Sequence, residues 1–201
     1  MKNLWYKNLQ GYINLIEEWN KKLNLISYKN KQELIINHIL DSLSIVEVFS
    51  LDNEEIIVDL GTGSGLPGIP LSIIYPHKKF YLVESKKKYI MFLKKVIETL
   101  NLKNISLFYG RMEDFSKIKC EVDIILNRAV GDIKKVFNIV LPFTKVNSKV
   151  IFYKGMTVFY ELNKYKEFLK DKGFEILILR KSKLLKKYGV NHYLLVVERI
   201  K

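Results

Sequence analysis

The chain has 201 residues, a length that fits one domain with at most a small extension. One cysteine and three histidines exclude an internal disulfide and disfavour a metal cage, so we expect no metal and a reducing, cytoplasmic setting. No apolar stretch could span a membrane, and no signal-peptide pattern is present. The net charge of +13 favours RNA or DNA over a membrane as partner, with a generally lysine-rich composition as the alternative explanation.

Two amphipathic helices are predicted in residues 1–50, as a helical extension packed on a core domain of residues 51–201. In residues 3–24 apolar side chains recur three or four positions apart, which favours packing on the core over binding a partner. A second helix, at about 33–49, contains His38-Ile39-Leu40-Asp41-Ser42. His38 and Asp41 share one helix face, where His38 either packs in the core or lines the substrate side.

A glycine-rich turn follows the apolar run 56–60. Gly61, Gly63 and Gly65 alternate with polar residues, which predicts a strand, a tight turn and a helix. Ligands of parallel α/β sheets bind at this edge. Leu66 stands where the dinucleotide fingerprint has its third glycine, which disfavours a nicotinamide enzyme. The run Asp-Leu-Gly-Thr-Gly-Ser-Gly instead resembles the first motif of class I methyltransferases that bind S-adenosylmethionine; a purely structural turn is the alternative.

Acidic side chains near this turn are predicted to hold such a cofactor. Asp59, which ends the first strand, could anchor the cationic amino group of the methionine half. Glu84 closes the next strand, 79–84, at the spacing where an acid meets a ribose hydroxyl pair. The third strand, 105–109, leads to Met112 and Glu113, which we expect beside the adenine ring.

The remaining pattern predicts alternating helices and strands that end in an antiparallel pair. The short loop 51–55 precedes the first strand. A basic segment, 180–189, suits a polyanion contact or is a solvated loop. The expected helices are 67–75, 86–100 with Ser85 as its N-cap, 132–141 and 158–172 with Gly173 as its C-terminal cap, and the further strands are 122–126, 150–153, 175–179 and 193–198. The order is that of a seven-stranded sheet of alternating α/β units.

Arg128 follows the fourth strand at its carboxyl edge, where an unpaired charge is costly. We therefore expect Arg128 either to be held in a structural ion pair or to meet substrate or cofactor. The segment 127–130 lacks the prolines typical of amine-methylating enzymes, and Cys120 lies at the wrong end of the strand for a pyrimidine nucleophile. An acceptor with a free lone pair, such as guanine N7, needs no base and fits this residue set.

The chain resembles the RsmG (GidB) family of bacterial small-subunit rRNA methyltransferases over almost its whole length. The resemblance rests on Asn24-Leu25, on residues 38–42, on Asp59 through Pro70, on Ser85 with the basic helix after it, and on Asn127-Arg128-Ala129 with Lys154-Gly155. It implies methyl transfer from S-adenosylmethionine to guanine N7 in 16S rRNA, with cofactor contacts at Gly61, Leu66, Met112, Glu113 and Arg128. Asn127, Val130 and Asn191 depart from the family pattern, which puts rRNA contacts in doubt rather than the turn.

The expected protein is thus a class I S-adenosylmethionine-dependent methyltransferase with a Rossmann-like α/β fold and a helical extension, monomeric, acting on 16S rRNA or the small ribosomal subunit. Two rivals stay open: a methyltransferase with a protein or small-molecule acceptor, and a non-catalytic RNA-binding assembly factor of the same fold. The predicted catalytic residues are Arg128, His38 and Lys154; the predicted cofactor-binding residues are Asp59, Gly61, Gly63, Gly65, Leu66, Glu84, Met112, Glu113 and Arg128.

Overall fold

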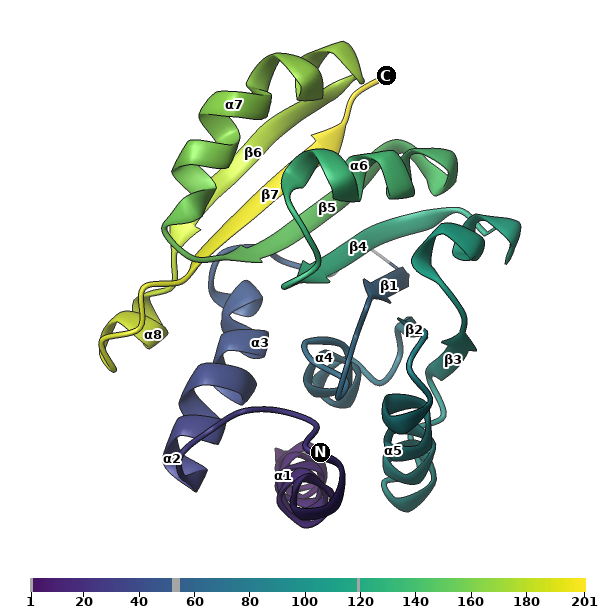
Figure 1. Ribbon diagram of the computed structural model, residues 1–201, viewed down its shortest axis with the longest axis vertical. Coiled ribbons are helices and arrows are strands. Elements are labelled where there is room, and N and C mark those ends of the chain that lie inside the picture. Colours follow the sequence, from purple (N-terminus) through teal and green to yellow (C-terminus); the bar gives the residue numbers. More distant parts are fainter. Residues whose placement is uncertain (1, 52–54, 119) are drawn as a thin grey trace.

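The computed structural model describes residues 2–51, 55–118 and 120–201, so most of the predicted loop 51–55 lies outside the described residues. A single seven-stranded sheet has the order β3-β2-β1-β4-β5-β7-β6 (Figure 1). The first five strands are parallel, and β7 is antiparallel to β5 and β6. The strands are β1 Ile56–Leu60, β2 Lys79–Glu84, β3 Ile105–Tyr109, β4 Val122–Arg128, β5 Thr144–Lys154, β6 Phe174–Lys181 and β7 Tyr193–Arg199. The predicted seven-stranded α/β architecture is confirmed.

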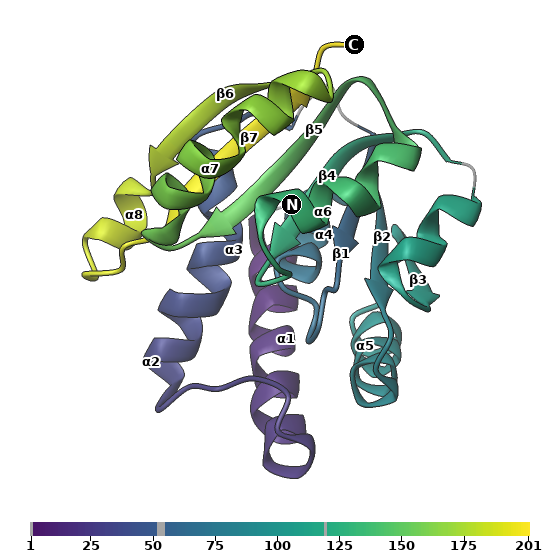
Figure 2. The same ribbon diagram turned by 45° about the horizontal axis from the view of Figure 1, so that its top comes forward.

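Helices cover both faces of this sheet (Figure 2). One face carries α6 Ile133–Val140, α7 Thr157–Asp171 and the short 3-10 helices η3 Met112–Ile118 and η4 Leu141–Phe143. The other carries α1 Lys2–Leu23, α4 Gly68–Ile74, α5 Lys87–Thr99 and the segment made of α2 Lys31–Leu34, η1 Ile35–Leu40, α3 Asp41–Leu43 and η2 Ser44–Glu47. A further short helix, α8 Lys183–Lys186, lies between β6 and β7. No helix in the described ranges is long and apolar enough to cross a bilayer.

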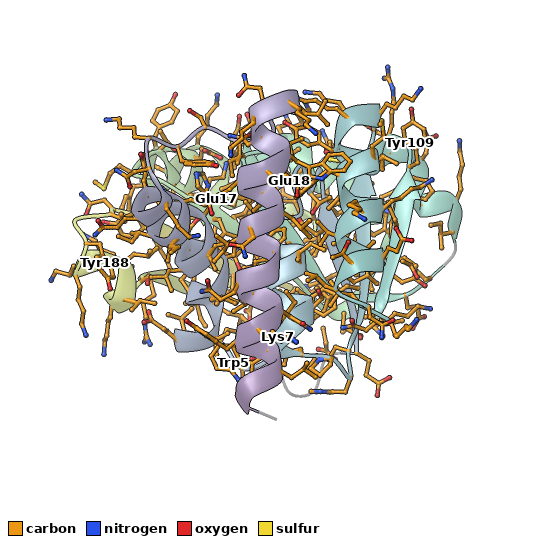
Figure 3. The ribbon with its side chains drawn as sticks, turned by 90° about the horizontal axis from the view of Figure 1, so that it is seen from below. Trp5, Lys7, Glu17, Glu18, Tyr109 and Tyr188 are labelled. Atoms are coloured by element: carbon orange, nitrogen blue, oxygen red, sulfur yellow. The ribbon has the colours of Figure 1, made fainter. Side chains whose placement is uncertain are left out.

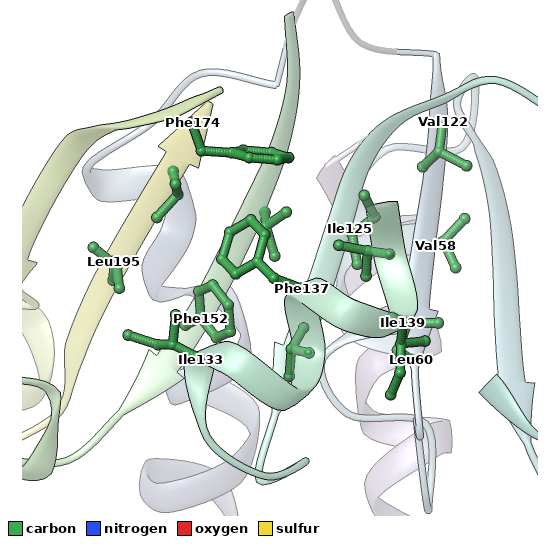
Figure 4. Packing of buried hydrophobic residues seen from close by; sticks show 14 of the residues in the cluster. Val58, Leu60, Val122, Ile125, Ile133, Phe137, Ile139, Phe152, Phe174 and Leu195 are labelled. Carbon is green, nitrogen blue, oxygen red and sulfur yellow. The ribbon is translucent and has the colours of Figure 1, made fainter. Parts of the chain in front are cut away.

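The core lies between the sheet and these two layers. Under α6 and α7, aromatic rings interlock: Phe137 packs edge-on against Phe174 with ring centroids 4.6 Å apart and tilts against Phe152 (Figure 4). Because alternate residues of a strand point to opposite faces, Ile125 packs into this cluster and its neighbour Ile124 into the cluster on the other face. The central strands are therefore buried on both sides, as parallel sheets require.

The long helix α1 runs along the outside of the molecule, across α4 and α5 (Figure 3). Its fully buried Tyr12 and Ile16 join one apolar cluster with Ile69 of α4 and Phe92 of α5. The predicted division at residue 50 stays a prediction, because this cluster mixes side chains from both sides of that boundary.

Several local predictions were wrong in detail. The predicted helix 33–49 is interrupted by the π-helical turn η1, after which Asp41 opens α3. Ser85 does not cap α5: the N-cap is Lys86, without a side-chain hydrogen bond, and the Glu84 carboxylate accepts the Ser85 and Lys86 N–H groups just before the helix. Strand β5 begins at Thr144, six residues before the predicted 150. Gly173, with φ of +75°, follows α7 as predicted.

Candidate active site

The glycine turn joins β1 to α4, and its glycines are needed for different reasons. Gly61, Gly63 and Gly65 have φ of +66°, +57° and +98°, a region that suits glycine. A Cβ on Gly61 would lie 2.7 Å from Val130 Cγ2, and one on Gly65 would lie 2.4 Å from Ile69 Cγ1. A Cβ on Gly63 would meet only the Gly61 carbonyl, at 4.0 Å. The space beside Gly63 is therefore open, as a ligand-binding turn requires.

Two buried side chains hold this turn from behind. One Asp59 carboxylate oxygen, Oδ2, accepts hydrogen bonds from the Thr62 hydroxyl (2.6 Å) and the Gly68 N–H (2.8 Å). Burial raises the pKa of Asp59 to about 6, and Oδ1 has no hydrogen-bond partner among the described residues. From α1, the fully buried Tyr12 hydroxyl donates to the Ser64 carbonyl at 2.7 Å. The sequence pattern pointed to Asp59 but gave no sign of Tyr12.

Glu84, at the end of β2, faces the same turn. Its Oε2 accepts the Gly63 N–H at 2.9 Å, and its Oε1 accepts the Ser85 and Lys86 N–H groups, both at 2.8 Å. These three N–H groups occupy three of the about four acceptor sites that a carboxylate offers, so about one site remains, on Oε2. Glu84 lines a pocket of about 250 Å³, together with Gly61, Val83, Ser85, Gly110, Arg111, Met112 and Glu113.

The other predicted cofactor residues divide between this pocket and the core. Met112 and Glu113 open η3 and line the pocket beside Gly61. Leu66 is only 6% exposed and packs its side chain into the cluster under α1, so its backbone is the part that can reach a ligand in the turn.

Arg128, at the end of β4, is held by the N-terminal segment. Its Nε lies 3.0 Å from Asp41 Oδ2, and its Nη2 lies 2.8 Å from the Asn37 carbonyl and 3.1 Å from His38 Nδ1. Burial and the adjacent guanidinium lower the pKa of His38, which keeps its ring neutral and able to accept from Arg128. Because β4 lies beside β1, with Asn127 paired to Leu60, the cluster around Arg128 lies beside the glycine turn.

A second histidine completes this cluster, and the sequence gave no signal for it. His192, just before β7, places Nδ1 2.9 Å from Asp41 Oδ1 although 151 residues separate the two. Asp41 is 1% exposed, so its buried carboxylate is shared between one arginine and one histidine. No spacing rule in a sequence connects residues this far apart.

Lys154, at the end of β5, is directed elsewhere. Its ammonium group contacts both oxygens of Glu161 in α7, at 2.9 and 3.0 Å, and donates to the Gly131 carbonyl at 2.9 Å. The structure thus brings His38 together with Arg128 but ties Lys154 to a separate ion pair. Over the described ranges, no group of three or more His, Cys, Asp or Glu side chains could hold a metal ion.

Comparison with known proteins places this chain in a family. A sequence model of GidB, "rRNA small subunit methyltransferase G", matches residues 5–187. The "Ribosomal RNA small subunit methyltransferase G" of Thermoanaerobacter pseudethanolicus is 37% identical over 198 residues, covering 96% of this chain and 82% of the relative. That of Alkaliphilus metalliredigens is 32% identical over 198 residues, covering 97% and 82%.

Solved structures with lower identity share the fold. M. jannaschii TYW2 in complex with AdoMet superposes with a TM-score of 0.60 at 20% identity, covering 87% of this chain and 79% of that one. Aeropyrum pernix fibrillarin with natively bound S-adenosyl-L-methionine gives a TM-score of 0.62 at 17% identity, covering 79% and 73%. The chain therefore belongs to the rRNA small subunit methyltransferase G (GidB) family and is an S-adenosylmethionine-dependent methyltransferase.

Proposed function

We propose that this enzyme methylates N7 of a guanine in the 530 loop of 16S rRNA. The observation that carries the proposal is the fixed Arg128 guanidinium at the end of β4, beside the glycine turn. Its Nη1 has no partner among the described residues, so a donor is available for substrate. On the N7 edge of guanine both N7 and O6 are acceptors. A hydrogen bond from Arg128 to O6 would fix the base and leave the N7 lone pair free to react.

The residues at the turn fit S-adenosylmethionine. The remaining acceptor site on Glu84 Oε2 suits a ribose hydroxyl, and the open space beside Gly63 suits the body of the cofactor. Oδ1 of Asp59 is a buried acceptor without a partner in the described ranges, as expected if it receives the amino group of the methionine half. When bound, the cofactor supplies a methyl group on a positively charged sulfur.

The chain's own contribution is positioning. Guanine N7 carries no proton, so its methylation needs no general base, and holding the two reactants in line supplies most of the rate enhancement. Asp41 and His38 fix the guanidinium of Arg128, and Arg128 in turn would fix the base. We propose no contact between Lys154 and guanosine, because its charge is neutralised by Glu161. The expected monomeric state and cytoplasmic location stay predictions.

The first test is methyl transfer from labelled S-adenosylmethionine to unmethylated small subunits and, separately, to naked 16S rRNA, followed by nucleoside identification. Labelled 7-methylguanosine is the expected product, and the better substrate shows which assembly state is recognised. Cofactor binding without transfer to either RNA would overturn the proposal and support a non-catalytic assembly factor. If a different nucleoside carries the label, the chain is still an rRNA methyltransferase, but its acceptor atom is not guanine N7.

A second test uses Arg128→Ala. Loss of the guanidinium leaves the buried Asp41 carboxylate with His192 alone, so we expect the variant to be less stable by roughly 3 kcal/mol. We also expect methylation to fall by about a hundredfold or more at a temperature where the variant stays folded. Unchanged turnover together with a lower melting temperature would show that Arg128 serves the fold alone.

A further inference from the structure

The buried carboxylate of Asp41 holds two groups at the carboxyl edge of the sheet. Oδ2 faces Arg128 Nε at 3.0 Å, and Oδ1 faces His192 Nδ1 at 2.9 Å. The Arg128 side chain is 16% exposed, whereas that of His192 is 39% exposed. One carboxylate therefore fixes a guanidinium and an imidazole side by side, and the imidazole is the more accessible to a large substrate.

The contact with Asp41 determines which imidazole nitrogen is available. An ionised carboxylate only accepts hydrogen bonds, so Nδ1 of His192 carries the hydrogen. In the neutral ring, Nε2 is then an acceptor, and no described residue donates to it. His38 has the opposite arrangement, with Nε2 against the Ser27 carbonyl (3.1 Å) and Nδ1 accepting from Arg128. The site thus presents one donor, Arg128 Nη1, and one acceptor, His192 Nε2.

His192 is fixed in place by contacts on both sides of the β6–β7 connection. Glu47 accepts hydrogen bonds from the Ser182 hydroxyl (3.0 Å) and from two backbone N–H groups at the start of α8. At the other end, Lys181 is hydrogen-bonded to Asn191, beside His192. The adjacent Tyr193 begins β7. The imidazole is therefore positioned by the sheet and by the N-terminal segment, rather than by a free loop.

The helix that carries the N-terminal residues of the cluster is irregular. The π-helical turn η1, Ile35–Leu40, directly precedes Asp41 and contains His38. Wide turns of this kind are uncommon and are frequent at functional sites. Of the two side chains that contact Arg128 from this segment, His38 lies within the π-helical turn and Asp41 directly follows it.

We propose that His192 is a substrate-contacting residue: its Nε2 accepts a hydrogen bond from N1–H of the target guanine, while Arg128 donates to the neighbouring O6. This proposal rests on the proposed function and names how that site selects its base. Guanine carries O6, an acceptor, next to N1–H, a donor. Adenine carries an amino group and an unprotonated N1 at the same two places. The Arg128–His192 pair matches the first arrangement and opposes the second at both atoms.

The test separates this contact from a purely structural role by using two near-isosteric variants. In His192→Asn the amide nitrogen can keep the hydrogen bond to Asp41, but nothing replaces the Nε2 acceptor. In His192→Gln the amide group reaches about the position of Nε2, and its oxygen can accept. The exposed His77, whose ring packs against Tyr75 outside the cluster, provides His77→Asn as the matched control.

Each variant is assayed for methyl transfer to small subunits carrying guanine at the target position and to subunits carrying adenine there. For His192→Asn we expect kcat/KM on the guanine subunits to fall about tenfold to a hundredfold, with unchanged cofactor affinity. The preference for guanine over adenine should fall by a similar factor. His192→Gln should recover a large part of both, and His77→Asn should match the wild type.

The proposal is overturned if His192→Asn leaves the guanine rate unchanged, or if it lowers transfer to both kinds of subunit equally. Failure to recover activity in a folded His192→Gln variant that binds cofactor normally would also count against it. If the wild-type enzyme methylates no small subunit, the proposed function itself has failed, a result that is distinct from every outcome for the variants.

Discussion

Single residues in the glycine turn divide into those that the fold requires and those that a ligand requires. A Cβ added at Gly61 or Gly65 would lie within 2.7 Å of a neighbouring side chain. Any larger residue there would therefore force the surrounding side chains to move. Gly63 has no such neighbour. Substitution at Gly63 therefore tests the ligand space with little disturbance of the packing around it.

Gly63→Val should abolish binding of S-adenosylmethionine while costing only about 1–2 kcal/mol of stability, because its φ of +57° disfavours a side chain. Calorimetric titration and thermal unfolding measure the two effects. Gly189→Val is the matched control, since Gly189 has φ of +75° and open surroundings but lies outside the pocket. Normal cofactor affinity in Gly63→Val would remove the turn from the binding site.

The contribution of Asp59 to folding stability should decrease as pH rises, which is the opposite of the usual behaviour of a carboxylate. Its pKa is raised to about 6 in the folded state from 3.8, so between these values the native state binds more protons than the unfolded state. Stability from this group is therefore greatest at low pH, is lost as pH rises to about 6, and stays constant above that. The full loss is roughly 3 kcal/mol.

Asp59→Asn removes this titration and keeps an oxygen for Thr62 and Gly68. Relative to the wild type, the variant should gain up to about 3 kcal/mol in stability between pH 4 and pH 6.5. Urea unfolding at several pH values measures the difference. A constant offset across this range would show that Asp59 titrates normally in the folded protein.

Among the elements, α1 does more than cover the sheet. Its Tyr12 reaches the backbone of the glycine turn, and its apolar stripe packs against α4 and α5, the helices that follow β1 and β2. The segment from α2 to η2 plays the equivalent role for Arg128 through Asp41 and for α8 through Glu47. The N-terminal helices thus support both halves of the site from behind.

Tyr12→Phe should show this support directly. The variant leaves the buried Ser64 carbonyl without its donor, so we expect a stability loss of about 1–2 kcal/mol and several-fold weaker cofactor binding. Tyr153→Phe is the matched control, because its buried hydroxyl also donates to a backbone carbonyl, that of Ser42 at 3.0 Å, outside the turn. Equal cofactor affinity in the two variants would mean that Tyr12 stabilises the fold without shaping the turn.

At the scale of the whole molecule, the excess of positive charge is relevant to substrate binding. The basic helix α8 lies in the same β6–β7 connection as His192, at the carboxyl edge of the sheet. Its Lys183 and Lys186 are exposed. Each lysine that neutralises a phosphate steepens the salt dependence of binding. This face is therefore where we expect rRNA to approach.

Changing Lys183 and Lys186 together to glutamate should weaken binding of small subunits and make the slope of log K against log salt concentration shallower by about 1.5–2. Lys166 and Lys170, exposed in the second half of α7, provide a control with the same change in charge. If both double variants change the slope equally, the positive charge acts as a diffuse field and α8 is not a specific contact.

The sequence by itself determined what depends on neighbouring residues. Apolar runs and helical patterns predicted all seven strands and the helices α4, α5, α6 and α7, but not the short helices η3 and α8. The glycine turn with Asp59 and Glu84 was recognisable because its parts lie at short, fixed spacings. Only the tertiary structure decided what depends on contacts between distant segments. Tyr12 meets Ser64 across 52 residues, and Asp41 meets His192 across 151. A hydrogen bond between such residues leaves no periodic trace in the chain, because its geometry exists only once the sheet has assembled.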